Sequence, residues 1–223
     1  MKIEIENAMK KIAVVLAGNG VYDGAEIHEA TLTLLAIARN GAQYQCFAPD
    51  VEQAHVVNHL TGEEMPEKRN VLVEAARIAR GNIKPLSDYN SEEFDAIVFP
   101  GGFGAAKNLC TFAFDGVDCK VNPDVEKAVR ATVAEEKPVG ALCISPVFIA
   151  KILGDVKVTI GQDEGTLQAI ETMGGMHEKT SHGQIVVDDK YKVVTTPCYM
   201  LEATIDQIAD GAENVVKKIL EMA

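Results

Sequence analysis

The feature that most constrains the fold is a regular alternation of short apolar runs with longer helical patterns. Four short apolar runs occupy residues 11–16, 44–48, 95–99 and 138–142, and the first of them (KIAVVL) is rich in β-branched residues. Such runs are typical of strands that are covered on both faces. Helical patterns with start or stop residues lie between and after them, at residues 24–39, 71–80, 122–136, 145–152 and 201–221. This order predicts an α/β fold with an open, mostly parallel sheet and helices on both faces.

The remaining segments extend the same pattern. Residues 156–160 are predicted to be a strand, 166–173 a helix, and 184–187 with 191–195 a hairpin. We find no Pro/Gly/Ser-rich linker, so we expect a single domain over residues 10–223. Met9 stands before Lys10 and Lys11 and could be an alternative start, which would leave residues 1–9 as an N-terminal extension.

Composition narrows the classes of partner. The net charge of -12 repels phosphate backbones and anionic lipids, so we predict no nucleic-acid partner, and no apolar run reaches membrane-spanning length. Five cysteines without a CxxC pair indicate free thiols in a reducing compartment, and no targeting segment is evident, so we expect a cytoplasmic protein. The histidines lack compact ligand spacing, so no metal is predicted; they include His55, His59, His177 and His182.

One cysteine stands where chemistry is expected. In open α/β sheets, ligands bind beyond the carboxyl ends of the strands. In residues 140–146 (GALCISP), a buried strand stops at Cys143 and a helix follows at once, which resembles a nucleophile elbow. Unpaired backbone N–H groups and the positive end of the helix dipole there should favour the thiolate over the thiol. Burial as an inert, small apolar side chain is the alternative.

Two further strand ends supply groups that could assist this cysteine. The turn at residues 100–104 (PGGFG) leaves backbone N–H groups open to a ligand, with Gly101 at its start. The N–H groups of Gly102 and Ile144 could together form an oxyanion hole. The first helical segment brings Glu26 and Glu29 near the same rim, and either carboxylate could hold or exchange a proton with a thiolate; we read Glu26 as a helix cap.

Several separate motifs, in order, resemble one family. They are residues 16–30 (LAGNGVYDGAEIHEA), 58–62 (NHLTG), 69–72 (RNVL), 100–109 (PGGFGAAKNL) and 195–197 (TTP). Together they resemble the ElbB group of the PfpI/ThiJ superfamily, which is similar in turn to class I glutamine amidotransferase domains. The resemblance runs from residue 10 to the C-terminus.

The resemblance implies a flavodoxin-like, three-layer α/β sandwich that is usually a homodimer. It also implies an elbow cysteine at Cys143 and a functional glutamate at Glu29. Members of the superfamily have been described as cofactor-independent glyoxalases or deglycases that act on small aldehydes and dicarbonyls, converting glyoxal to glycolate. ElbB proteins have also been linked to isoprenoid biosynthesis, but this link does not identify a reaction.

The chain departs from related enzymes at two places. Amidotransferases carry a His-x-Glu pair where residues 195–199 read TTPCY, and protease-type relatives carry a histidine where Ile144 stands. Glutaminase and protease activities are therefore not expected, although His177, His182 or Cys198 could still reach the site. A Gly-rich match at residues 18–24 is one residue too long for a dinucleotide fingerprint, so no cofactor is predicted. The rival to an enzyme is a redox or stress sensor in which Cys143 is oxidised.

Overall fold

The computed structural model describes residues 9–223, and the N-terminal segment 1–8 lies outside the described residues. Seven strands form the main sheet in the order β3-β2-β1-β4-β5-β9-β8. All neighbouring pairs are parallel except β8 and β9, which are antiparallel. The strands are β1 Lys11–Val15, β2 Gln43–Ala48, β3 Ile83–Pro85, β4 Ala96–Phe99, β5 Val139–Leu142, β8 Val186–Asp188 and β9 Val193–Thr196.

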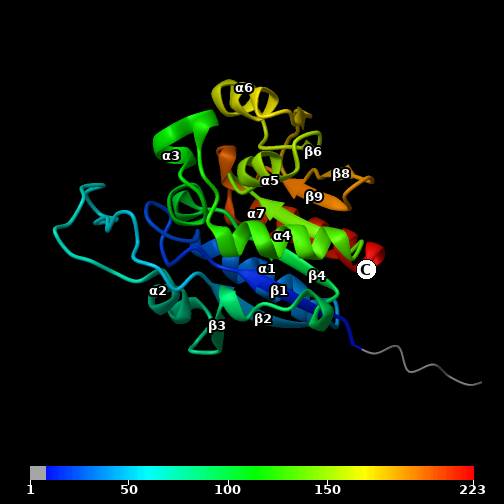
Figure 1. Cartoon of the computed structure of the whole chain (residues 1–223), viewed down its shortest axis with the longest axis horizontal. Helices are drawn as coiled ribbons and strands as arrows, with labels where there is room; N and C mark the ends of the chain where they lie inside the picture. The colour runs from blue at the N-terminus through cyan, green and yellow to red at the C-terminus, as the bar shows by residue number, and fades with distance from the viewer. Residues whose placement is uncertain (1–8) are drawn as a thin grey trace, which may run out of the picture.

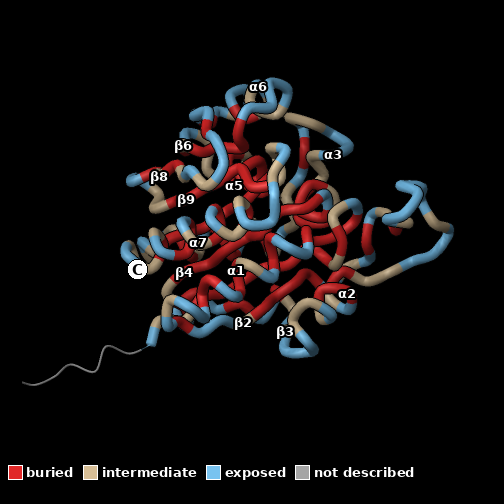
Figure 2. The backbone as a smooth tube through the Cα atoms, turned by 180° about the vertical axis from the view of Figure 1, so that it is seen from behind, coloured by how far each residue is buried: buried red, intermediate tan, exposed pale blue. Residues whose placement is uncertain are grey.

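Helices cover both faces of this sheet, as Figures 1 and 2 show from opposite sides. One apolar core joins the sheet to α1 (Ile27–Arg39), α2 (Val71–Ile78) and α7 (Ile205–Met222), and the other joins it to α4 (Pro123–Ala134) and α5 (Pro146–Leu153). Strand β1 divides its side chains accordingly: Ile12 and Val14 face the first core, Ala13 and Val15 the second. The predicted flavodoxin-like, three-layer sandwich is confirmed.

Most of the apolar surface of α1 is covered within the chain. The helix packs against α7 as well as against the sheet, whereas Ile27 and Leu35 stay exposed. The homodimer that the family resemblance implies stays a prediction. None of the helices in residues 9–223 combines the length and hydrophobicity that a membrane crossing requires.

The elements between β5 and β8 differ from the prediction. Strands β6 (Lys157–Val158) and β7 (Met176–His177) form a separate two-stranded sheet, with α6 (Glu164–Thr172) between them in the chain. The strand expected at residues 156–160 is therefore wrong in its length. The reason lies in the tertiary structure, because side chains from elsewhere in the chain accept hydrogen bonds from its N–H groups: Thr195 Oγ1 accepts from Thr159 N at 2.9 Å, and His177 Nε2 accepts from Ile160 N at 3.1 Å.

Short helical pieces complete the chain. They are α3 (Phe112–Asp115), the 3-10 turns η1 (Leu86–Asp88), η2 (Ser91–Glu93), η4 (Gly116–Asp118) and η5 (Cys198–Met200), and a π-helical turn η3 (Ala105–Leu109). Residues 49–70 form a long excursion between β2 and α2 that reaches away from the sheet (Figure 1) and is largely exposed or half-buried (Figure 2). Strand β3 was not predicted because three residues carry too little periodicity.

Candidate active site

Cys143 occupies the turn between β5 and α5. Its backbone N–H continues the β5–β9 pairing by donating to Thr196 O at 3.0 Å, and its φ of 59° then reverses the chain toward the helix. A positive φ is uncommon for a residue with a Cβ and is maintained only where surrounding contacts fix it. Ser145 supplies one of these contacts, because its buried Oγ donates to Pro100 O at 3.0 Å. The predicted elbow is therefore a fixed feature of the fold.

The glycine turn after β4 lies directly against this cysteine. A Cβ added at Gly101 would lie 2.3 Å from the Cβ of Cys143 and 2.9 Å from its sulfur, so only glycine fits. Gly102 has a φ of 101°, which also favours glycine. The N–H groups of Gly102 and Ile144 both hydrogen-bond to the Cys143 thiol. The two predicted donors thus converge on one point beside the sulfur.

Glu29 is the acidic partner of the thiol. Its side chain is fully buried in the first turn of α1 and hydrogen-bonds to Cys143. Its Oε2 accepts from Gly101 N at 2.8 Å and its Oε1 from Tyr199 N at 3.2 Å. Burial, together with the negative charge of Glu26, raises the pKa of Glu29 to about 7. The carboxyl can therefore gain or lose a proton near neutral pH.

Glu26 caps the helix that carries Glu29. Its Oε2 accepts from Glu29 N at 2.7 Å, as expected of an N-cap. The helix begins at Ile27, three residues after the start of the helical pattern predicted over residues 24–39. Asp23 accepts from Val57 N at 2.7 Å. The cap fixes the first turn of α1, and with it the direction of the Glu29 side chain.

The sequence predicted that the start of the helix would favour the Cys143 thiolate, and the structure corrects this prediction. Burial and the negative charge of Glu29 raise the pKa of the Cys143 thiol well above its usual range, although the N–H groups of Gly102 and Ile144 act in the opposite direction. The first helical residue, Pro146, also has no N–H to offer. A proton on Glu29 would remove the repulsive charge and leave a donor beside the sulfur, so the two groups share one proton.

A pocket of about 390 Å³ opens onto the sulfur, although Cys143 itself is only 7% exposed. Most of its lining is apolar and comes from Val21, Phe103, Ala106, Phe112, Ile144 and Met200. Polar ends come from Asp163, Thr166 and Tyr199, and the Tyr199 hydroxyl hydrogen-bonds to His28 Nδ1 at 2.8 Å. None of the lysines, arginines and histidines in the described part of the chain lines it. Such a pocket suits a small, uncharged ligand.

Other predicted candidates lie apart from this pocket. Cys198 is buried next to the site but does not line the pocket. His177 accepts from Ile160 N in the β6–β7 region, and His182 is exposed on a loop. Neither histidine lines the pocket. Lys107, at the end of the glycine-rich segment after β4, donates to Tyr22 O at 2.8 Å.

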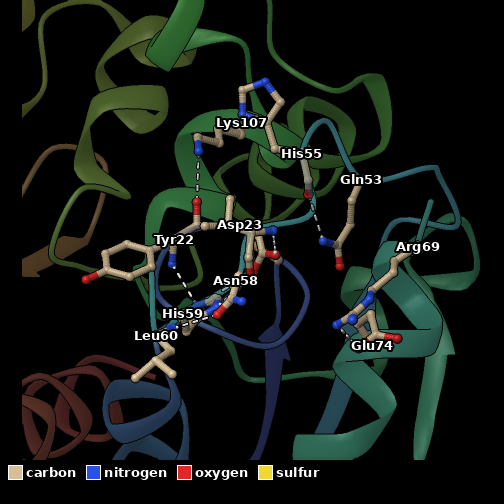
Figure 3. A network of polar contacts seen from close by, with 12 residues as sticks. Tyr22, Asp23, Gln53, His55, Asn58, His59, Leu60, Arg69, Glu74 and Lys107 are labelled. Carbon is tan, nitrogen blue, oxygen red and sulfur yellow. Dashed lines mark hydrogen bonds and ion pairs between the residues drawn. The ribbon is translucent and has the colours of Figure 1, made fainter. Parts of the chain in front are cut away.

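The excursion at residues 49–70 is tied to the pocket rim through the network in Figure 3. His59 Nε2 accepts from Tyr22 N at 3.1 Å, so its Nδ1 carries the proton and donates to Val57 O at 3.0 Å. The buried Asp23 carboxylate lies 3.8 Å from His59. These bonds hold the turn that places Val21 in the pocket wall.

Sequence reasoning did not identify the pocket residues Tyr199, Asp163 and Thr166. Tyr199 belongs to the segment TTPCY, which was read only for the histidine that it lacks. Asp163 caps α6 by accepting from Thr166 N at 2.8 Å. A capping residue can be predicted from sequence, but the sequence does not show that the start of α6 lies beside the pocket at Cys143. Their positions depend on how the chain turns after β9 and before α6.

A cysteine at a strand-to-helix turn of a flavodoxin-like sheet, facing a helix-borne glutamate, is the arrangement expected of an amidotransferase-like α/β protein. A solved structure from Ehrlichia chaffeensis, described as an isoprenoid biosynthesis protein with an amidotransferase-like domain, has a TM-score of 0.90 and 38% identity, covering 96% of this chain and 99% of that one. Glyoxalase III from Candida albicans has a TM-score of 0.63 at 15% identity, covering 96% and 97%, and so shares the fold alone.

Sequence comparison gives the particular family. The human glutamine amidotransferase-like class 1 domain-containing protein 3 is 46% identical, covering 100% of this chain and 87% of the relative. A rat ES1 protein homolog is 47% identical, covering 95% and 84%. The chain belongs to this family of glutamine amidotransferase-like (ES1) proteins. No family model matches the chain.

These relatives correct the predicted location. The human and rat proteins, and an ES1 protein from zebrafish, are all named as mitochondrial. The prediction of a cytoplasmic protein is therefore wrong. The free thiols indicated only a reducing compartment, and they do not distinguish the cytoplasm from other compartments of that kind.

Proposed function

We propose that the chain is a cofactor-independent cysteine enzyme that acts on small aldehydes or dicarbonyls, such as glyoxal. The observation that carries this proposal is the hydrogen bond between Cys143 and a fully buried Glu29 whose pKa is about 7. A nucleophile and a proton carrier thus meet at the inner end of an apolar pocket. Among residues 9–223, no basic side chain lines the pocket to bind a carboxylate or phosphate, so the substrate should carry no negative charge.

The first step joins sulfur to carbon. The Cys143 thiolate adds to one carbonyl carbon of glyoxal, and the C=O electron pair moves onto oxygen. The N–H groups of Gly102 and Ile144, which already point at the sulfur, would stabilise this oxyanion. Protonation of the oxygen gives a hemithioacetal.

The next steps move hydrogen between the two carbons. Glu29 takes the proton from the carbon bonded to sulfur, which gives an enediol, and returns a proton to the second carbon. The first carbon is thereby oxidised to a thioester and the second is reduced to an alcohol, so no external oxidant or reductant is needed. Water then hydrolyses the thioester, which releases glycolate and restores the thiol.

The test is to incubate the pure protein with glyoxal and with methylglyoxal and to follow formation of the hydroxy acid. We expect turnover by the wild type and none above background for Cys143→Ser. Cys46→Ser is the matched control, because Cys46 is buried in β2 and does not line the pocket. Absence of Cys143-dependent turnover would refute the proposal.

A second candidate is a sensor in which Cys143 is oxidised to a sulfinate. The donors around the sulfur favour it, because a protonated Glu29 and the N–H groups of Gly102 and Ile144 could all bind sulfinate oxygens. Peroxide titration with mass spectrometry tests this candidate. Oxidation of Cys143 ahead of the other four thiols, in a protein without turnover, would support the sensor over the enzyme. Equal oxidation of all five would count against it.

A further inference from the structure

Two other cysteines lie at the base of a short closed loop. Cys110 pairs with Val121 in an isolated antiparallel bridge. Thr111 N donates to Lys120 O at 2.9 Å, and Asn122 N donates to Leu109 O at 2.9 Å, which extends this pairing on both sides. Cys119 stands two residues before Val121, so its side chain lies diagonally across from Cys110 on the same face of this pairing, and each thiol influences the ionisation of the other. The fold therefore holds two free thiols beside each other.

The two thiols differ in their surroundings. Both cysteines are almost completely buried, and Cys110 Sγ lies 3.4 Å from Ala105 O. Cys119 differs in that it lines a surface depression of about 300 Å³ together with Lys151, whose Nζ donates to Val117 O at 2.7 Å beside it. The neighbouring Cys110 thiol, and after it the positive charge of Lys151, hold the pKa of Cys119 below its usual range. Cys119 is therefore the more nucleophilic of the two thiols near neutral pH.

We propose that Cys110 and Cys119 form a reversible disulfide when the protein meets a hydroperoxide, and that this bond restrains one wall of the Cys143 pocket. The Cys119 thiolate attacks the peroxide oxygen, which gives a sulfenic acid and releases water from hydrogen peroxide. The Cys110 sulfur then displaces the hydroxyl group of that sulfenic acid as a second water. The two thiols lose two electrons and two protons in total, and the peroxide is reduced.

The link to the pocket follows from the loop between the two cysteines. Phe112 and Ala113 belong to this loop and also line the pocket at Cys143. A covalent bond between Cys110 and Cys119 would narrow the conformations that this wall can adopt. This disulfide can be tested without the proposed activity, because its formation and its effect on the pocket are both measured by chemical labelling and not by turnover.

The chain offers a direct assay for the disulfide. Lys107 and Lys120 flank both cysteines, so trypsin releases them in one peptide, residues 108–120. The full-length protein is exposed to hydrogen peroxide, quenched with iodoacetamide and digested. Before peroxide treatment, we expect this peptide to carry two alkylated cysteines. After treatment, we expect it to carry no alkyl group and to be two hydrogens lighter than the reduced, unalkylated peptide. Further cleavage after Phe112 or Phe114 should leave two fragments joined by a disulfide.

Variants separate the two roles. In Cys110→Ser, we expect Cys119 to form a sulfenic acid that dimedone traps, whereas in Cys119→Ser we expect Cys110 to stay a free thiol. Cys46→Ser is the control, because burial raises the pKa of that thiol to about 12 and the disulfide should form unchanged. Thermal melts of the reduced variants check that they fold.

Two results would overturn the inference. The first is a wild-type peptide that keeps both thiols free while glutathione in the same tube is oxidised. The second concerns the pocket: we expect alkylation of Cys143 by iodoacetamide to slow about threefold or more in the disulfide form, relative to peroxide-treated Cys110→Ser. Equal rates would overturn the coupling to the pocket.

Discussion

Cys143 and Cys198 stand at equivalent places on neighbouring strands, yet only one of them lies in a site. Each follows the carboxyl end of a parallel strand, β5 or β9, and each has a positive φ, 59° and 42°. Both are buried, with 7% and 5% of their surface exposed, and burial raises the pKa of both thiols well above the usual range. Strand position, burial and backbone conformation are therefore not enough to identify a nucleophile.

The difference lies in what surrounds each sulfur. Cys143 receives two N–H groups, hydrogen-bonds to Glu29 and opens onto the pocket. Within residues 9–223, no hydrogen bond lowers the pKa of Cys198, and the charges of Glu29 and Cys143 act against its ionisation. Cys143 differs from Cys198 because two N–H donors and the Glu29 carboxyl group converge on its sulfur, at a point that a substrate can reach.

Glu29→Gln should separate the two cysteines most strongly. The amide keeps the volume of the side chain but cannot carry a proton between carbons, so we expect glyoxal turnover to fall by about a thousandfold. Alkylation of Cys143 at pH 7 should become faster at the same time, because the charge that raises its pKa is gone. Cys198 should stay unlabelled, since it does not line the pocket.

The opposite changes in turnover and labelling make this test specific. A variant that merely loosened the fold would lose turnover and would expose both cysteines to alkylation. Retention of near wild-type turnover by Glu29→Gln would show that the carboxyl does not transfer the proton. Peptide mapping after a short iodoacetamide pulse gives the rates at both cysteines in one sample.

Two glycines, one beside each cysteine, give the next comparison. In Gly101→Ala the new Cβ would lie 2.3 Å from the Cβ of Cys143 and 2.7 Å from Glu29 Oε2, so we expect a loss of about 3 kcal/mol in the free energy of unfolding. In Gly211→Ala the Cβ would lie 3.3 Å from Cys198 Sγ within α7. Helix propensity favours alanine there by about 1 kcal/mol, which offsets the tight contact. The net change should stay within about 1 kcal/mol.

Urea unfolding followed by circular dichroism measures both changes. Gly101→Ala should also lose turnover, because the elbow and the glycine turn would have to separate. If the two variants were equally stable, the close packing of the glycine turn against Cys143 would not be a constraint on the folded state.

The sequence was sufficient to predict the elements that meet at the site. The carboxyl ends of parallel strands share one edge of a sheet, so Cys143 and the glycine turn with Gly102 were expected together, and the structure places them in contact. Glu29 followed from the family resemblance. Tyr199 could not be predicted, since its contact with Glu29 depends on a 3-10 turn after β9 that leaves no periodic pattern.

The ionisation of the thiol was also beyond the sequence. A strand-to-helix turn indicates N–H donors, and these do lower the pKa of Cys143. The opposing effects, burial and the neighbouring Glu29 carboxylate, exist only once α1 packs beside the elbow. The sign of the shift is therefore a property of tertiary structure, as is the loss of strand pairing at residues 159 and 160, whose N–H groups bond to side chains from elsewhere in the chain.

Glu26→Gln should produce the smallest effect, a shift in pH dependence. Below the pKa of Glu29, both Glu29 and the Cys143 thiol hold protons and the pair carries no negative charge, so wild-type kcat/KM should rise as the pH increases through about 7. The negative charge of Glu26 raises that pKa, and its removal lowers it. The rise should therefore move to lower pH, by about one unit or less.

The amide at position 26 keeps an oxygen to accept from Glu29 N, so α1 should retain its cap and the maximum rate should hardly change. Glu126→Gln on α4, across the sheet, is the matched control and should leave the profile in place. The charge of Glu26 also raises the pKa of Cys198, so removal of that charge perturbs both cysteines. If the pH profile of turnover shifts in Glu26→Gln while Cys198 stays unlabelled, then a lower thiol pKa is not enough to make a cysteine reactive. Proton sharing with Glu29 then separates Cys143 from Cys198. An unshifted profile would mean that Glu29 does not control the rise.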